Sequence, residues 1–252
     1  MANKKDRLRL AAVADLHCTQ KSADSTRNLL SAMANEADIL LLGGDLCDAG
    51  LPEEAEILAR EISIFKVPVV AVLGNHDYEA GKESAIISIL SDAGVNVLDG
   101  KSCEIYGVGF AGAKGFAGGF GERALQSWGE TTIKTFVHEA VEEALKLESA
   151  LAALRTPKRI ALLHYSPIVE TVMGEPPEIF PFLGSSRLED PLNRYPVAAV
   201  FHGHAHRGSL EGVTKAGVRV FNVAKSLLQN VSSNGLPFKI MEIDSTDSEI
   251  EK

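Results

Sequence analysis

Three short apolar runs in the first third of the chain constrain its fold more than any other feature. They lie at residues 9–14, 38–45 and 67–74. Each run ends at Gly or Asp or just before it, and helical patterns follow at 24–36, 52–65 and 82–93. Buried strands that alternate with helices need crossover connections, which place neighbouring strands parallel. The chain is therefore predicted to have an α/β fold built on a parallel sheet.

The second half of the chain continues with more strands, one long helix and a proline-rich segment. A single strand is expected over 103–110, and the glycines of 107–121 predict a flexible turn region. Apolar residues then recur every three or four positions from Ile133 to Leu154, which is typical of an amphipathic helix. Further strands are expected at 159–163, 197–201, 218–221 and 238–243. Six of the 10 prolines fall within 166–196, which predicts a long loop.

Polar side chains gather where the predicted strands end. In chain order they are Asp15, His17, Asp45, Asn75, His76, Asp77, His164, His204 and His206. Because ligands of open α/β sheets bind beyond the carboxyl ends of the strands, these side chains are expected to share one edge. Carboxylate, amide and imidazole donors together suit Mn, Fe or Zn ions. The donors exceed the needs of one ion, so we expect two ions about 3.5–4 Å apart that together hold a phosphoryl group.

The motifs resemble those of the calcineurin-like metallophosphoesterase superfamily. The segments that carry the resemblance are Asp15-Leu16-His17, Gly44-Asp45, Gly74-Asn75-His76-Asp77, His164 and Gly203-His204-Ala205-His206. The resemblance implies a layered α/β sandwich in which helices flank two central mixed β-sheets. It implies that the whole chain, 1–252, forms one domain, with a lid or insert at 111–156 and a proline-rich active-site loop at 166–196.

The resemblance also assigns a role to each motif residue. Asp15, His17 and His206 would bind the first metal ion. Asn75, His164 and His204 would bind the second, and Asp45 would bridge both. His76 would be the general acid or a donor to the phosphoryl oxygens, and Asp48 would orient His76 and raise its basicity.

The implied reaction is hydrolysis of a phosphate ester, in which a hydroxide that bridges the two ions attacks phosphorus in line. The expected cofactors are Mn²⁺, Fe or both, and Zn²⁺ would also suit the donors. Two arginines, Arg187 and Arg207, are candidates for a positive contact with the substrate. The sequence does not indicate an oligomeric state.

Two departures from the family pattern bear on the substrate. Ala49 stands where phosphoprotein phosphatases of the superfamily have an arginine that grips a phosphate dianion, and Asp77 replaces their glutamate. Because a phosphodiester carries only one negative charge, both departures favour the phosphodiesterase-like branch. A phosphomonoesterase or nucleotide phosphatase on the same site is the alternative. A metal-binding scaffold without catalysis is a third hypothesis.

The alternating histidines His202, His204 and His206 raise a local question of geometry. On a straight strand all three side chains would point to one side. The roles implied for His204 and His206 place them on different ions, so the chain is expected to turn at Gly203-His204. His202 is then expected to have a packing role.

Composition limits the partners and the compartment. The net charge is −9 and no cluster of Lys and Arg is found, so a nucleic-acid partner is not expected. The sequence shows no apolar run of about 18 residues and no signal-peptide core. The cysteines are few and odd in number, 3 in all. We therefore expect a cytoplasmic protein that acts on a small phosphate ester and does not bind a membrane.

Overall fold

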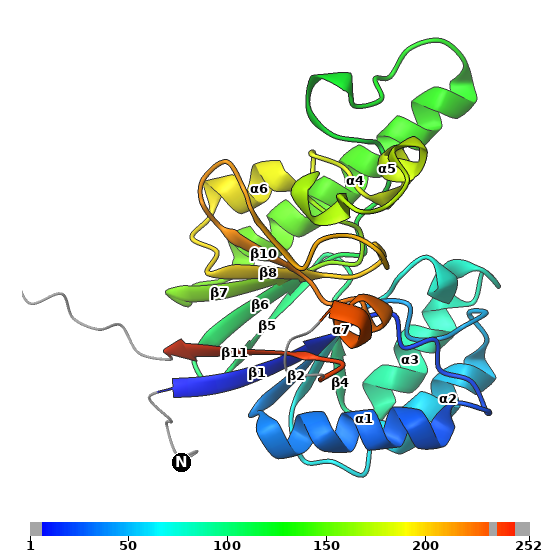
Figure 1. Ribbon diagram of the computed structural model, residues 1–252, viewed down its shortest axis with the longest axis vertical. Coiled ribbons are helices and arrows are strands. Elements are labelled where there is room, and N and C mark those ends of the chain that lie inside the picture. The colour runs from blue at the N-terminus through cyan, green and yellow to red at the C-terminus, as the bar shows by residue number, and fades with distance from the viewer. Residues whose placement is uncertain (1–6, 232–235, 245–252) are drawn as a thin grey trace, which may run out of the picture.

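The computed structural model describes residues 7–231 and 236–244, and it contains two β-sheets that pack face to face between layers of helices (Figure 1). The first sheet has the strand order β11-β1-β2-β3-β4. Its strands are β1 (Arg7–Val13), β2 (Ile39–Gly43), β3 (Val69–Val72), β4 (Val95–Val97) and β11 (Lys239–Asp244). Strands β1 to β4 run parallel and β11 pairs antiparallel with β1, so the sheet is mixed.

The second sheet has the order β5-β6-β7-β8-β10-β9 and is mixed as well. Its strands are β5 (Lys101–Ile105), β6 (Val108–Gly112), β7 (Lys158–Leu162), β8 (Ala199–His202), β9 (Glu211–Val213) and β10 (Arg219–Asn222). The α/β sandwich with two mixed sheets, expected from the resemblance, is therefore confirmed.

The pattern of burial shows why the sequence forms these layers. On β1, Leu10 and Ala12 belong to the core between the two sheets, whereas Ala11 and Val13 pack under the helices of the outer layer. Strands that are buried on both faces need apolar residues at every position. This requirement explains the continuous apolar runs of the first 75 residues.

Helices cover the outer face of each sheet. The first sheet is covered by α1 (Ala23–Glu36), α2 (Pro52–Ile62) and α3 (Glu83–Asp92). The second is covered by α4 (Thr131–Ala153) and α6 (Glu189–Arg194). The short helix α7 (Lys225–Val231) follows β10. Within the described ranges, no helix is long and apolar enough to cross a membrane.

The prediction of one strand over 103–110 is wrong, because the chain reverses inside it. Tyr106 and Gly107 both have positive φ, 53° and 84°, and they join β5 to β6 as an antiparallel hairpin. Two consecutive residues with positive φ form the turn whose twist matches the flanking strands. The predicted turn region at 107–121 therefore begins with a strand, and only its later part is irregular.

The segments expected to form a lid and a loop contain regular structure. The proline-rich residues 166–196 hold the short helices η3 (Glu170–Val172), η4 (Pro177–Ile179), α5 (Phe180–Leu183) and α6. In the other segment, the later part of α4 packs on β5, β6 and α6. Residues 121–136, the loop before α4 with its first turns, are mostly exposed and extend beyond the sheets (Figure 1). We call residues 121–136 the overhang, and its role as a lid stays a prediction.

Candidate metal centre

The ends of strands from both sheets bring the predicted ligands together. In the part of the chain that the structure describes, three groups of side chains have donor atoms within 4.8 Å of one another. The groups are Asp15 with His17 and His206, His17 with Asp45 and His76, and Asp45 with His164 and His204. Asn75 joins the third group, because its Oδ1 lies 2.9 Å from His164 Nε2. All seven predicted ligands, together with His76, thus lie in one connected cluster.

Four residues of the cluster have a positive backbone φ, which residues other than glycine rarely adopt. Among the described residues, five that are not glycine have φ between 47° and 68°. They are Asp15, His17, Asp45, Tyr106 and His204. Such strain persists only where the surroundings enforce it, and it concentrates at functional sites. β8 ends at His202, and the positive φ of His204 two residues later confirms the predicted turn at Gly203-His204.

Glycines of the motifs allow the loops to approach the carboxylates. A Cβ at Gly74 would collide with Asp45 Oδ1, and one at Gly203 would lie 2.6 Å from Asp15 Oδ2. These glycines leave the space that the buried carboxylates occupy. The Gly-Asn-His and Gly-His motifs are therefore steric requirements of the cluster as well as sequence markers.

The two buried carboxylates are ionised. Burial raises the pKa of Asp45, but His164 and the N–H of His76, 2.9 Å from Oδ1, hold it well below its ordinary value. Burial also raises the pKa of Asp15, but its hydrogen bond with His206 at 3.0 Å and the charges of His164 and His206 together lower that pKa below its ordinary value. Both side chains are thus anionic at neutral pH, as metal ligands must be.

Backbone carbonyls decide which nitrogen of His164 and His204 is free for a metal. A carbonyl can only accept, so His164 Nδ1 donates to Gly43 O at 2.9 Å and leaves Nε2 facing Asn75 and Asp45. His204 Nε2 donates to Phe182 O at 3.2 Å, which leaves Nδ1 free. Burial and the nearby His164 lower the pKa of His204 to about 4, so its ring is neutral. Hydrogen bonds of this kind orient imidazole ligands in metal sites.

The expected contact between the Asp48 carboxylate and His76 is corrected by the structure. His76 Nδ1 lies 2.6 Å from the backbone carbonyl of Asp48. The carboxylate of Asp48 instead lies 3.4 Å from His17 Nδ1. The backbone turn after Asp45 presents the carbonyl to His76 and directs the side chain to the neighbouring ring. Asp48 thus still fixes the His76 ring, and its charge faces His17.

Asp77 braces the two loops that carry Asp45 and Asn75. Its buried carboxylate accepts the N–H of Gly74 at 2.8 Å, of Cys47 at 2.8 Å and of Leu46 at 3.1 Å. Burial raises its pKa to about 6. The carboxylate therefore ties the loop after β2 to the loop after β3.

Two further side chains support the cluster and were not found from the sequence. The Tyr165 ring packs on the His204 ring with 4.5 Å between centroids. Lys225, the first residue of α7, donates from Nζ to Leu16 O at 2.7 Å and so supports the first ligand loop. The position of Tyr165 beside His164 was an available signal. Lys225 lies 209 positions from Leu16 and had none.

His202 lies outside the three donor groups. Its buried ring contacts Thr171 Oγ1 at 2.8 Å through Nε2 and Gly203 O at 2.8 Å through Nδ1. Thr171 also contacts Ser166 at 2.7 Å. His202 therefore packs the ligand loop against the beginning of the proline-rich segment, as its predicted packing role requires.

The two arginines predicted to touch the substrate lie in other surroundings. Arg187 Nη2 donates to Leu125 O at 3.0 Å and holds the overhang. Arg207 is exposed, and its backbone N–H donates to Glu175 at 2.7 Å. Among the described residues, no hydrogen bond or ion pair joins either guanidinium to the metal cluster. Contact of either arginine with a substrate stays a prediction.

Comparisons with known proteins give a consistent result. A family model described as calcineurin-like phosphoesterase matches residues 8–208, a range that contains every predicted ligand. The phosphopantetheinyl hydrolase from Mycobacterium tuberculosis is similar in structure, with a TM-score of 0.66 and 15% identity over 92% of this chain and 95% of its own. The comparison with curated proteins found no match.

Two more solved structures share the fold. GAP50, described as the anchor in the inner membrane complex of Plasmodium, has a TM-score of 0.56 and 14% identity over 98% of this chain and 88% of its own. A putative 5'-nucleotidase from Staphylococcus aureus has a TM-score of 0.53 and 13% identity over 86% of this chain and 48% of its own. At these identities the likeness concerns the fold.

Proposed function

Because the chain belongs to the calcineurin-like phosphoesterase family of metal-dependent phosphoester hydrolases, we propose that it hydrolyses a small phosphodiester at a two-metal centre. One observation carries the proposal. The two oxygens of Asp45 face histidines of different donor groups, His17 Nε2 at 4.0 Å and His164 Nε2 at 3.4 Å. A carboxylate placed in this way suits a bridge between two ions.

The residues present fit such a pair of ions. Asp15, His17 and His206 would hold one ion, and Asn75, His164 and His204 the other, with Asp45 shared. The mixed donors suit Mn²⁺, Fe or Zn²⁺. When bound, the ions supply Lewis acidity to the phosphoryl oxygens and to the attacking water. The 3 cysteines, free in the structure, fit the reducing cytoplasm, which we include in the proposal.

His76 is the side chain best placed to handle the proton of the leaving group. Its Nδ1 is held by Asp48 O, which leaves Nε2 of the half-exposed ring available to a substrate. In the imidazolium form, Nε2–H would donate to the departing alkoxide oxygen, a step worth about 10²–10⁴-fold in rate. His76 also shares a donor group with His17 and Asp45, which supports its position beside the reacting phosphorus.

We base the preference for a diester on the residue at position 49, which has no positive charge to offer a phosphate dianion. Ala49 occupies the position of the phosphate-gripping arginine of the related phosphoprotein phosphatases. The competing phosphomonoesterase hypothesis has a structural neighbour in the putative 5'-nucleotidase. The scaffold hypothesis has one in GAP50, described as an anchor. The strained and complete donor set favours an enzyme over a scaffold.

The test compares bis(p-nitrophenyl) phosphate with p-nitrophenyl phosphate, using chelator-treated protein to which Mn²⁺ is added back. We expect turnover of both esters and a larger kcat/KM for the diester. Asp45→Asn should lower turnover at least about 100-fold. Absence of turnover with two metals bound would contradict the function and favour a scaffold. A larger kcat/KM for the monoester would contradict only the diester preference.

A further inference from the structure

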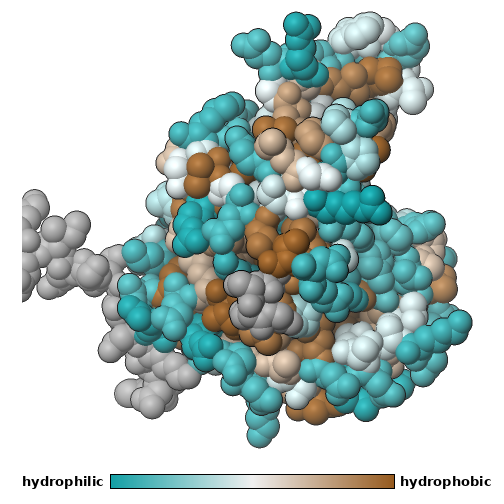
Figure 2. Space-filling model, in the orientation of Figure 1, coloured by the Kyte–Doolittle hydropathy of each residue, from teal (hydrophilic) through white to brown (hydrophobic). Residues whose placement is uncertain are grey.

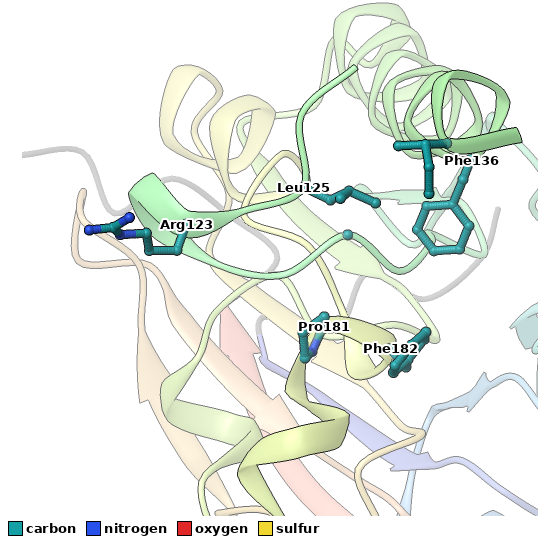
Figure 3. A pocket seen from close by; sticks show the side chains of 7 residues that line it. Arg123, Leu125, Phe136, Pro181 and Phe182 are labelled. Carbon is teal, nitrogen blue, oxygen red and sulfur yellow. The ribbon is translucent and has the colours of Figure 1, made fainter. Parts of the chain in front are cut away.

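An apolar pocket lies between the overhang and the proline-rich segment (Figure 3). Its volume is about 420 Å³. Apolar side chains of Leu125, Ile133, Phe136, Pro181 and Phe182 line it. In Figure 3, Leu125 and Phe136 lie on one side of the space, and Pro181 and Phe182 on the opposite side. The volume is in the range of pockets that hold small molecules.

The pocket adjoins the metal centre through a single residue. The ring of Phe182 lines the pocket, and the carbonyl of Phe182 accepts the Nε2–H of His204 at 3.2 Å. Phe182 therefore belongs to the pocket wall and also contacts His204, a predicted metal ligand. A substrate whose phosphoryl group lies at the metal centre needs a place nearby for the rest of the ester.

Hydrogen bonds join the walls of the pocket. Gly118 N–H donates to Pro181 O at 2.7 Å, and Leu125 N–H donates to Gly118 O at 2.8 Å. Arg187 Nη2 also donates to Leu125 O, at 3.0 Å. These contacts fix the overhang and the proline-rich segment relative to each other.

The chemistry of the lining selects an apolar occupant. Among the described residues that line the pocket, only Arg123 is charged, and its guanidinium points away from the space between the walls (Figure 3). A sugar or nucleobase would bury polar groups here without partners, which is costly. Figure 2 shows hydrophobic surface in the region of the overhang. The overhang residue Trp128 is 67% exposed. Burial of an apolar substituent in this pocket would be favourable.

We propose that this pocket binds an apolar alkyl or aryl substituent of the phosphate ester whose phosphoryl group lies at the metal centre. The inference rests on the proposed function and adds a substrate class to it. The preferred substrate is then an amphipathic phosphodiester, charged at one end and apolar at the other.

The experiment varies the substituent at constant leaving group. The Mn²⁺-loaded protein is given methyl, butyl, hexyl and octyl p-nitrophenyl phosphates. We expect kcat/KM to rise about two- to fourfold per methylene until the pocket is filled. Ile133→Asp and Leu125→Asp place a charge in the pocket and should flatten this rise. The matched control is Leu145→Asp, on the same helix, 49% exposed and outside the lining, which should retain it.

A binding measurement separates this inference from the proposed function. Calorimetry with butyl and octyl phosphate, which need no turnover, should show tighter binding of the longer chain, and Ile133→Asp should abolish the difference. If no ester is hydrolysed but the longer chain binds more tightly, the pocket assignment stands and the proposed function fails. Turnover with no dependence on chain length overturns the pocket assignment alone. A dimer that dissociates in Ile133→Asp, without chain-length dependence, would also overturn it and assign the pocket to a subunit contact.

Discussion

At the scale of single residues, the buried side chains of the centre stabilise one another's charges. Burial lowers the pKa of His164, but Asp45 at 3.4 Å, the charge of Asp15 and the carbonyl of Gly43 together raise the pKa to about 9. The ordinary value is 6.5, so the folded protein binds this proton more tightly than the unfolded chain does. The stability that it contributes is fully present below about pH 6.5 and is lost as pH rises through about 9.

We therefore expect the melting temperature of chelator-treated protein to fall across this window. His164→Asn removes the titrating ring and should remove this part of the slope. An unchanged slope in the variant would contradict the assignment. The same proton competes with a metal ion for Nε2, so the affinity for Mn²⁺ should increase as the pH rises toward 9.

At the scale of elements, the loops after β2 and β3 depend on one carboxylate. Asp77→Asn keeps the shape of the side chain but replaces one acceptor oxygen with an NH₂ group that faces N–H donors. We expect a loss of about 1–3 kcal/mol in unfolding free energy and weaker binding of Mn²⁺, because the Asp45 and Asn75 loops separate. Denaturant unfolding and metal titration measure the two effects. Asp92→Asn, an exposed change at the end of α3, is the control and should alter neither.

Elements with a strong local pattern were predictable from sequence, and those decided by tertiary contacts were not. Strands β2 and β3, which precede Asp45 and Asn75, and the part of β1 from Leu10 onward are buried on both faces, and this explains their apolar runs. The reversal at Tyr106 was missed because Tyr rarely adopts positive φ. The residues that usually mark such a turn in a sequence are Gly, Asn and Asp.

The candidate site shows the same division. Its donor residues were predictable because each follows an apolar run. The direction of the Asp48 side chain depends on the backbone turn at that residue, and the partner of Arg187, Leu125 O, lies 62 positions away. Neither contact follows from a regular spacing along the sequence, so neither could be predicted from it.

At the scale of the whole molecule, the metal centre joins the two sheets. Asp15, Asp45 and Asn75 follow strands β1, β2 and β3 of the first sheet, whereas His164 and His204 follow β7 and β8 of the second. Ions bound between them would connect both halves of the sandwich at one edge. Metal binding would then stabilise the packing of the sheets against each other as well as the loops.

Metal loading should therefore raise the melting temperature of the entire domain in one transition. A ligand that binds only the folded state at about 100 times its Kd adds about 2.7 kcal/mol, which corresponds to roughly 5–10 °C for a chain of this size. Calorimetric scans with and without Mn²⁺ measure the shift. Asp45→Asn, which removes the shared carboxylate, should abolish most of it, whereas His206→Ala should retain the part due to the second ion. Two separate transitions, of which only one moves with Mn²⁺, would show instead that the ions stabilise a single sheet.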